Sequence, residues 1–533
     1  MATATELSIN ESASALQMAQ AIFGTGVTII TASVPGGDAP DYDGDNRSSG
    51  IFTGGNTTSP GVTPGDSGVI LSTGRVRDFT NSNGSSNTNV RGNTSTNTSG
   101  DNNDPLFNAA AGANTFDAAY LDVDFIPTGS VMTMQFVFAS EEYPEFQNSV
   151  YQDFVGVWVN GAQVELSLGN GDADPGNVNS NSNANLYQDN TGDQFNTEMD
   201  GFTVTMTLKM NVVPNQINSI RIGIADVSDN SYDSNLLIAG NSIQTDIIAQ
   251  DDSTNLFPTG TRTLDVLAND IDNGSTLTIT EINGQPVGVG DTVTLTSGQT
   301  VSLNADGTLE IVGDGDTEDF AFTYKADSGT NSDIAFVNVS SIPCFVAGTL
   351  ILTPDGEVPV ESLAPGALVV THDNGHQPVR WVGQRTVDSE GAFAPIHIRA
   401  NTFGTHKDLL VSPQHRVLIR DSLAELLFGD AEVLVAAKDL VNDYSVRPRT
   451  GGTVTYVHIL FDEHQVVFSE GLPTESFLPG PQTTKSFERD IVEEICALFP
   501  EIDPETGSGY SAAARRTLRQ FEAQVLMSRQ KAA

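Results

Sequence analysis

The residues best suited to nucleophilic and acid–base chemistry lie in the C-terminal part of this 533-residue chain. Cys344 is one of two cysteines, and no histidine precedes it. A thiol is a good nucleophile because part of it ionises near neutral pH, and imidazole is its usual acid–base partner. This distribution predicts a nucleophile at the first residue of a domain, with residues 1–343 as its cargo. The seven histidines are His372, His376, His397, His406, His415, His458 and His464.

Three blocks of strand and turn signals must position this chemistry. The first runs from Cys344 to Val369 and contains two alternating strands around the turn at residues 353–356, followed by a second turn. The second covers residues 409–418 and the third covers residues 456–468. The residues in the last two blocks that could assist a nucleophile are Ser412, His415, Asp462 and His464.

In this order the three blocks resemble the Hint fold, the self-processing module of Hedgehog proteins and inteins. Ser412-Pro413-Gln414-His415 stands where the family has a Thr-x-x-His block. The residues Pro395 to Arg399 and Gly471 to Phe477 are most similar to the bacterial Hint_2 subgroup. The resemblance covers residues 344–480 and implies an all-β, horseshoe-like domain.

The resemblance implies an N-to-S acyl shift. The Cys344 thiol attacks the carbonyl of Pro343 and converts the amide into a thioester. His415 would protonate the departing amine, and Ser412 would hydrogen-bond the scissile amide or the tetrahedral oxyanion. His397, His406 and His458 are expected to be structural or surface residues. Two further residues stand where the family places groups that assist the thiol or the second step, and they are Asp462 and His464.

Two departures from the intein pattern narrow the expected chemistry. Inteins end in Asn followed by a nucleophile, but here Gly471-Leu472 is followed by Pro473-Thr474-Glu475. Full splicing is therefore not expected, and the thioester would be hydrolysed or transferred to an external nucleophile. Pro343 precedes the nucleophile, and its rigid ring hinders the shift. The alternative is a non-catalytic, calcium-dependent adhesin or surface-binding protein with a degenerate Hint domain. No cofactor is expected for the Hint chemistry.

Composition excludes two classes of partner. The formal net charge is −44, and only eight of the 24 Lys and Arg precede Cys344. Nucleic acids and anionic membranes need clustered positive charge, so neither is expected as a partner. No run of 18 apolar residues predicts a transmembrane segment. The N-terminus lacks the basic region of a cleavable signal. We expect an extracellular protein, exported by a type I-like route, with a surface ligand of unknown identity.

Residues 1–247 are predicted to form a large β-sandwich-like domain. Residues 137–143 and 224–229 resemble motifs of the choice-of-anchor L family of bacterial surface and secreted proteins, which implies an adhesive or recognition module. Carboxylates that follow apolar strands can converge on one Ca²⁺, although solvated turns are the competing interpretation. The segment Asp41 to Asn46 is a further acidic candidate. The predicted ligands after the strands are Glu141, Glu142, Asp226, Asp229 and Asp233.

Residues 248–342 are predicted to form a small immunoglobulin-like sandwich of short strands separated by Gly and Asp turns. The signature Asp265-Val266-Leu267-Ala268-Asn269-Asp270 looks like cadherin-like repeats of large bacterial secreted proteins. That resemblance implies a spacer that holds calcium close to the motif. The candidate ligands are Asp265, Asn269, Asp270 and Asp272.

Residues 481–533 are predicted to form a short helical tail. Phe487 to Phe499 places Cys496 on an apolar helical face as a core thiol, and residues 512–527 are predicted to form a second helix. We expect these helices to dock on the Hint domain or to form a C-terminal export signal.

Overall fold

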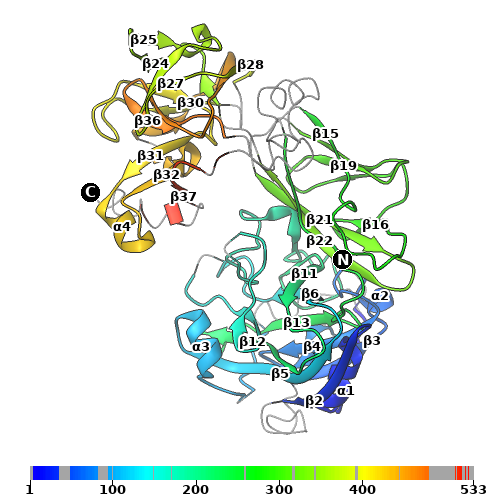
Figure 1. Cartoon of the computed structure of the whole chain (residues 1–533). Helices are drawn as coiled ribbons and strands as arrows, with labels where there is room; N and C mark the ends of the chain where they lie inside the picture. The colour runs from blue at the N-terminus through cyan, green and yellow to red at the C-terminus, as the bar shows by residue number, and fades with distance from the viewer. Residues whose placement is uncertain are drawn as a thin grey trace.

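The structure is a computed structural model of the chain, drawn whole in Figure 1. The residues that it describes are 4–34, 48–81, 94–98, 100–147, 149–169, 171–256, 260–314, 319–340, 344–389, 394–442, 444–478, 511, 513–518, 522–523 and 526. The predicted mainly-β, multidomain architecture is confirmed, because most elements are strands of six sheets. Among the helices in these ranges, none has the length and apolar character needed to span a membrane.

The N-terminal domain consists of two sheets that share one apolar core. The first sheet has the order β1-β3-β4-β13-β6-β10-β9, with β11 also paired to β6, and the second has the order β2-β5-β12-β7-β8. Residues of both sheets, such as Phe136 of β6 and Ile222 of β12, are fully buried in the common core. The strands are β1 (Ser8–Asn10), β2 (Val27–Ser33), β3 (Ser49–Thr53), β4 (Ser67–Ser72), β5 (Thr115–Pro127), β6 (Val131–Ser140), β7 (Phe154–Val159), β8 (Ala162–Gln163), β9 (Tyr187–Asp189), β10 (Gly201–Thr203), β11 (Met206–Asn211), β12 (Asn218–Val227) and β13 (Ser234–Ala239).

Short helices cover the edges of this sandwich. Helix α1 (Ala15–Ile22) begins with a capping box, in which Ser14 Oγ accepts from the Gln17 N–H and Gln17 Oε1 accepts from the Ser14 N–H. Its buried face packs on β2 and β4. Among the described residues of this domain, the other helices are α2 (Gly55–Thr58) and α3 (Pro105–Ala111), with 3₁₀ turns at Val76–Phe79 and Ala184–Leu186.

The middle domain is the predicted sandwich of two sheets. Their strand orders are β14-β22-β21-β16-β17 and β15-β20-β19-β18. The first strand, β14, pairs with the last, β22, in parallel. The strands are β14 (Asp252–Asn255), β15 (Thr261–Leu264), β16 (Thr278–Ile282), β17 (Gln285–Pro286), β18 (Thr292–Thr294), β19 (Thr300–Leu303), β20 (Leu309–Val312), β21 (Phe320–Asp327) and β22 (Ser332–Ser340).

The middle domain packs directly against the N-terminal one, where β22 lies next to β11 and β6 and β21 contacts the 3₁₀ turn at Ala184–Leu186 (Figure 1). Ala321 and Phe336 of the middle domain are buried in the N-terminal core. Asn185 is also buried, and its side chain donates to the Ala321 carbonyl at 3.1 Å. This packing makes the middle domain more than the spacer that the sequence predicts.

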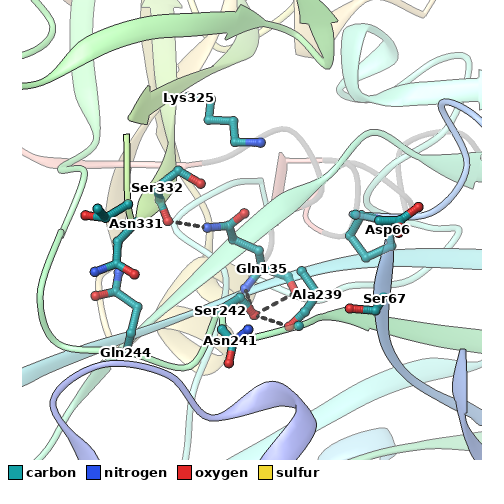
Figure 2. Close-up of a pocket in the computed structure, with 14 residues that line it drawn as sticks. Asp66, Ser67, Gln135, Ala239, Asn241, Ser242, Gln244, Lys325, Asn331 and Ser332 are labelled. Carbon is teal, nitrogen blue, oxygen red and sulfur yellow. Dashed lines mark hydrogen bonds between the residues drawn. The ribbon is translucent and has the colours of Figure 1, made fainter. Parts of the chain in front are cut away.

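A polar pocket of about 290 Å³ lies at this boundary. Figure 2 shows Asp66, Ser67 and Gln135 on the N-terminal side and Lys325 and Ser332 on the side of the middle domain. Gln135 Nε2 donates to the Ser332 carbonyl at 2.8 Å across the pocket. The pocket is therefore crossed by a hydrogen bond that ties the two domains together.

The C-terminal domain again consists of two sheets around one core. Their orders are β28-β34-β23-β30-β29-β33 and β25-β24-β35-β36-β31-β32-β37, with β26 paired to β35 and β27. Helix α4 (Ser422–Phe428) follows β31. The strands are β23 (Phe345–Val346), β24 (Leu350–Thr353), β25 (Gly356–Pro359), β26 (Leu368–Thr371), β27 (Gly375–Pro378), β28 (Trp381–Asp388), β29 (Ile396–Ile398), β30 (Leu409–Val411), β31 (Arg416–Arg420), β32 (Glu432–Ala436), β33 (Val446–Pro448), β34 (Thr453–Leu460), β35 (Val466–Ser469), β36 (Leu472–Glu475) and β37 (Arg516–Thr517).

The tail corrects one prediction. The helix predicted over residues 512–527 is wrong at Arg516–Thr517, which form β37 and pair in parallel with β32. The free edge of β32 offers backbone partners, and such tertiary pairing overrides local helix propensity. The segment Phe487 to Phe499 and its Cys496 lie outside the described residues, as does the acidic segment Asp41 to Asn46.

Candidate active site

Cys344 is held at the entrance to strand β23, between two other strands. The next residue, Phe345, pairs with Val411 of β30 and with Val457 of β34. The Cys344 N–H donates to Ser412 Oγ at 2.8 Å, and the Ser412 N–H donates to the Cys344 carbonyl at 3.0 Å. Ser412 therefore fixes both backbone groups of Cys344, including the nitrogen that an acyl shift would release. Pro343, on the other side of that bond, lies outside the described residues.

His458, which the sequence predicted to be a structural or surface residue, lies beside the Cys344 thiol. Cys344 Sγ is 3.3 Å from His458 Nε2, and both residues are buried. Phe345 faces Val457 in an antiparallel pair, so the register places His458 opposite Cys344. Phe477 packs edge-on against the His458 ring, with the ring centroids 5.4 Å apart. The thiol therefore has an imidazole nitrogen within proton-transfer distance.

Tyr456 completes the surroundings of the thiol. It clusters with Cys344 in a small apolar group on the same side of β34 as His458, two residues away. Burial raises the pKa of the Tyr456 phenol, and the nearby Cys344 raises it further. Both effects favour the protonated, neutral phenol beside the sulfur.

His415 occupies the turn that begins at Ser412. Its N–H donates to the Ser412 carbonyl at 3.1 Å, and its ring packs on Phe345 with centroids 4.3 Å apart. Burial lowers the pKa of His415 to about 4. Within the described residues neither ring nitrogen has a hydrogen-bond partner. A buried imidazole next to the nucleophile with both nitrogens unused is available for proton transfer.

The buried carboxylate of Glu475 interacts with both His415 and His464. Glu475 Oε1 accepts from the Arg416 N–H at 2.9 Å, and Oε2 lies 3.1 Å from the Arg416 guanidinium and 3.6 Å from His464 Nε2. Burial raises the pKa of Glu475, but Arg416 and His464 outweigh it and lower the pKa to about 2. The negative charge of Glu475 raises the His415 pKa and so opposes the effect of burial on it. His464 therefore belongs to this network rather than to the immediate contacts of the thiol.

Asp462 lies away from these contacts. Its side chain is half exposed, and both carboxylate oxygens are bound by Arg380, at 2.8 and 2.7 Å. His397 pairs with Asp408 at 3.4 Å, as expected of a structural residue. The structure therefore brings Cys344, Ser412, His415 and His458 together, with His464 and Glu475 behind them, and leaves Asp462 outside.

Of the five carboxylates predicted as calcium ligands in the N-terminal domain, four are buried and one is partly exposed. Glu142 and Asp226 are buried beside Asp153, a residue that the sequence analysis did not select. The Asp153 N–H donates to Glu142 Oε2 at 2.8 Å, and Asp153 Oδ2 accepts from Ser234 Oγ at 2.8 Å. Glu141 and Asp233 are also buried, whereas Asp229 is partly exposed and binds its own turn through the Ser231 N–H.

The middle-domain candidates are turn residues. Asp265, Asn269 and Asp272 are exposed. Asp270 Oδ1 accepts from the Tyr324 hydroxyl at 2.8 Å and the Gln250 N–H at 2.7 Å. Across the described ranges, no group of three or more His, Cys, Asp or Glu is arranged to hold a metal ion. Calcium at either set of residues therefore stays a prediction.

The buried carboxylates predict a pH dependence of stability. Burial raises the pKa of Glu142 to about 9 and also raises those of Asp153 and Asp226. The folded state then binds more protons than the unfolded state above about pH 4.5, so stability falls as pH rises toward about 9, by up to about 1.4 kcal/mol per pH unit for Glu142, and the two aspartates act in the same direction. We expect the melting temperature in EDTA to be lower at pH 8.5 than at pH 5.5. Glu142→Gln should reduce that difference, and a melting temperature that rises with pH would contradict this assignment.

The calcium prediction has a separate test in the same domain. At pH 8, Ca²⁺ bound by Glu142 and Asp226 would replace the protons that these carboxyls otherwise need, and binding to the folded state raises its stability. Millimolar CaCl₂ should then raise the melting temperature by several degrees, and Asp226→Asn should abolish the rise. An unchanged melting temperature with calcium or EDTA would count against the site.

Comparison with known proteins agrees with this architecture. Residues 343–481 match the family model of the Hint domain, Hint_2, and residues 7–244 match that of the choice-of-anchor L domain. The chain therefore carries a choice-of-anchor L domain and, after the middle sandwich, a Hint domain. No curated protein matches the chain.

Solved structures show more distant similarity. The gp41-1 intein is 12% identical, with 25% of this chain and 97% of that chain covered and a TM-score of 0.16. The MchDnaB-1 intein is 16% identical, with 24% and 98% covered and a TM-score of 0.16. Extracellular domains 3–5 of Drosophila OTK are 11% identical, with 50% and 85% covered and a TM-score of 0.15. At these TM-scores the similarities carry no argument about function.

Proposed function

We propose that the chain cleaves its own peptide bond between Pro343 and Cys344 through a thioester, without splicing. One observation carries the proposal: the Cys344 nitrogen is bonded to Ser412 Oγ while the Cys344 sulfur lies 3.3 Å from His458 Nε2. The two atoms whose bonds change in an N-to-S acyl shift thus each have a polar partner. The Hint domain match at 343–481 supports the same reaction class.

The first step forms the carbon–sulfur bond. His458, in the tautomer with an unprotonated Nε2, accepts the thiol proton. The thiolate then attacks the Pro343 carbonyl carbon and gives a tetrahedral intermediate. Because Cys344 is buried, a nearby base matters more than it would for a solvated thiol, since burial alone disfavours the thiolate.

The second step breaks the carbon–nitrogen bond. The Cys344 nitrogen leaves as an amine and must gain a proton. We assign its delivery to His415, whose neutral ring can take up a proton on one nitrogen and release the N–H of the other. The proton that His458 took from the thiol balances this transfer, so the shift consumes no net proton. Ser412 Oγ holds the nitrogen in place before the bond breaks. Water or an external thiol or amine then attacks the thioester and frees the Cys344 thiol.

The end of the Hint domain supports cleavage rather than splicing. Glu475 and Ser476 lie in the block Gly471 to Phe477, and both are buried. The Glu475 carboxylate accepts from Arg416, and Ser476 Oγ accepts from the Gln465 N–H. Neither side chain is the Asn amide that cyclises in an intein. The N-terminal fragment would carry the choice-of-anchor L domain, and we propose that it acts outside the cell as a surface-binding module.

The experiment is incubation of the purified full-length protein with dithiothreitol. We expect two products, residues 1–343 and residues 344–533, which mass spectrometry identifies. The second candidate function, a non-catalytic adhesin, predicts an intact chain under the same conditions. A chain that stays whole after prolonged thiol treatment would contradict self-cleavage.

A further inference from the structure

We propose that Ser511 and residues 513–518, beyond the Hint domain match, are a working part of the Hint site and fix the tautomer of His464 through the Ala514 N–H. This inference rests on the proposed function and adds to it a part of the site that lies 30 residues beyond the end of the family match at residue 481.

The segment is anchored to the Hint domain on both sides of Ala514, by Ser511 before it and by Arg515 to Leu518 after it. On the C-terminal side, Arg516–Thr517 pair with β32, and the Leu518 N–H donates to the Leu434 carbonyl at 2.9 Å. Leu518, Ala523 and Leu526 are buried in the Hint core. The sequence left open whether this tail docks on the Hint domain or forms an export signal, and these contacts favour docking.

Arg515 holds the same segment by charge. Its guanidinium bonds Glu432 of β32 at 3.0 Å and Asp373, in the turn between β26 and β27, at 2.7 Å. One cation thus bridges two carboxylates from separate parts of the domain. The bridge lowers the pKa of Asp373 and keeps its carboxylate charged. The neighbouring Ala514 therefore has a fixed position relative to the sheet.

The fixed segment contacts His464 at two points. The His464 backbone N–H donates to Ser511 Oγ at 2.7 Å, and the Ala514 N–H donates to His464 Nδ1 at 2.9 Å. A backbone amide can only donate, so Nδ1 must present its lone pair. The single proton of the neutral ring is then on Nε2, which faces the Ser476 carbonyl at 3.1 Å and Glu475 at 3.6 Å.

This tautomer matters for the groups next to the nucleophile. A proton on Nε2 donates toward the Ser476 carbonyl and the Glu475 carboxylate, whereas an Nδ1–H tautomer would place a lone pair against both. His415 also lies in the field of Glu475, whose negative charge favours the protonated form of His415. By holding His464 in this form, the tail leaves the Glu475 charge to favour protonation of His415. Ala514 is thus a positioning residue that acts through His464.

The test compares two substitutions at position 514 in the full-length chain. Ala514→Pro removes the N–H that reaches His464, whereas Ala514→Gly keeps it. We expect Ala514→Pro to slow release of fragment 1–343 in dithiothreitol by about tenfold to a hundredfold, the range found for outer groups that orient metal-bound histidines. Ala514→Gly should stay within about twofold of the unsubstituted chain. Equal rates for the two variants would overturn the inference.

A second readout does not depend on cleavage. In a Cys344→Ala chain labelled with ¹⁵N-histidine, imidazole ¹⁵N spectra report which nitrogen carries the proton, and His464→Gln assigns the signal. We expect the Nε2–H tautomer at His464 and its loss in Ala514→Pro. An Nδ1–H tautomer in the chain with Ala514 intact would overturn the inference even if the proline variant fails to fold. If the unsubstituted chain releases no fragment, only the proposed cleavage fails, and the spectra still decide the role of the tail.

Discussion

Cys344→Ala is expected to abolish release of fragment 1–343 under dithiothreitol, with no product above background after the wild-type chain has reacted to completion. The substitution removes the sulfur that must attack the Pro343 carbonyl, and no hydroxyl or amine replaces it. Folding should survive, because Cys344 is a small side chain at the start of a two-residue strand. Electrophoresis with mass determination of both products is the measurement.

The matched control for this result is Cys344→Ser. A hydroxyl can form an ester by the same shift but ionises far less readily than a thiol, so slow cleavage at the same bond is expected. Cleavage of the Cys344→Ala chain at the wild-type rate would show that a contaminating protease, and not Cys344, cuts the chain.

His458→Gln is expected to slow the thiol-induced cleavage by about a hundredfold or more at pH 7, within the usual range for removal of a general base. The reason is the 3.3 Å contact between His458 Nε2 and the Cys344 sulfur. The deficit should shrink as the pH rises well above the ordinary thiol pKa of about 8.5, because the buried thiol then ionises without help. The measurement is the pH dependence of the cleavage rate of wild type and variant, with melting temperatures to confirm folding.

His397→Gln is the control for this experiment, because His397 pairs with Asp408 and has no role in the proposed reaction. Its rate should match wild type at every pH. A His458→Gln rate that stays equally reduced at high pH would assign His458 to packing, together with Phe477, and not to proton transfer from the thiol.

The sequence predicted the parts of the site that lie in recognisable blocks. Cys344, Ser412 and His415 were selected from residue type and order, and the structure places them in contact through β23, β30 and the turn after β30. His458 was missed because its relation to Cys344 depends on the register between β23 and β34, which are more than a hundred residues apart. Knowledge of the pairing between Phe345 and Val457 would have identified His458 as the neighbour of Cys344.

The remaining differences also come from long-range contacts. Asp462 lies in the same block as His458, but its carboxylate faces Arg380 at the surface. Asp153 joins Glu142 and Asp226 only because β7 lies beside β12 in the folded sheet. The strand at Arg516–Thr517 forms because β32 has a free edge, which local propensity cannot show.

The central claim is a thioester at Cys344, and hydroxylamine trapping tests it most directly. Incubation of the full-length protein with hydroxylamine at neutral pH, followed by mass spectrometry, should give a fragment of residues 1–343 with a C-terminal hydroxamate on Pro343. The partner fragment should begin with an unmodified Cys344. An intact chain, or a fragment that ends at a residue other than Pro343, would contradict the account.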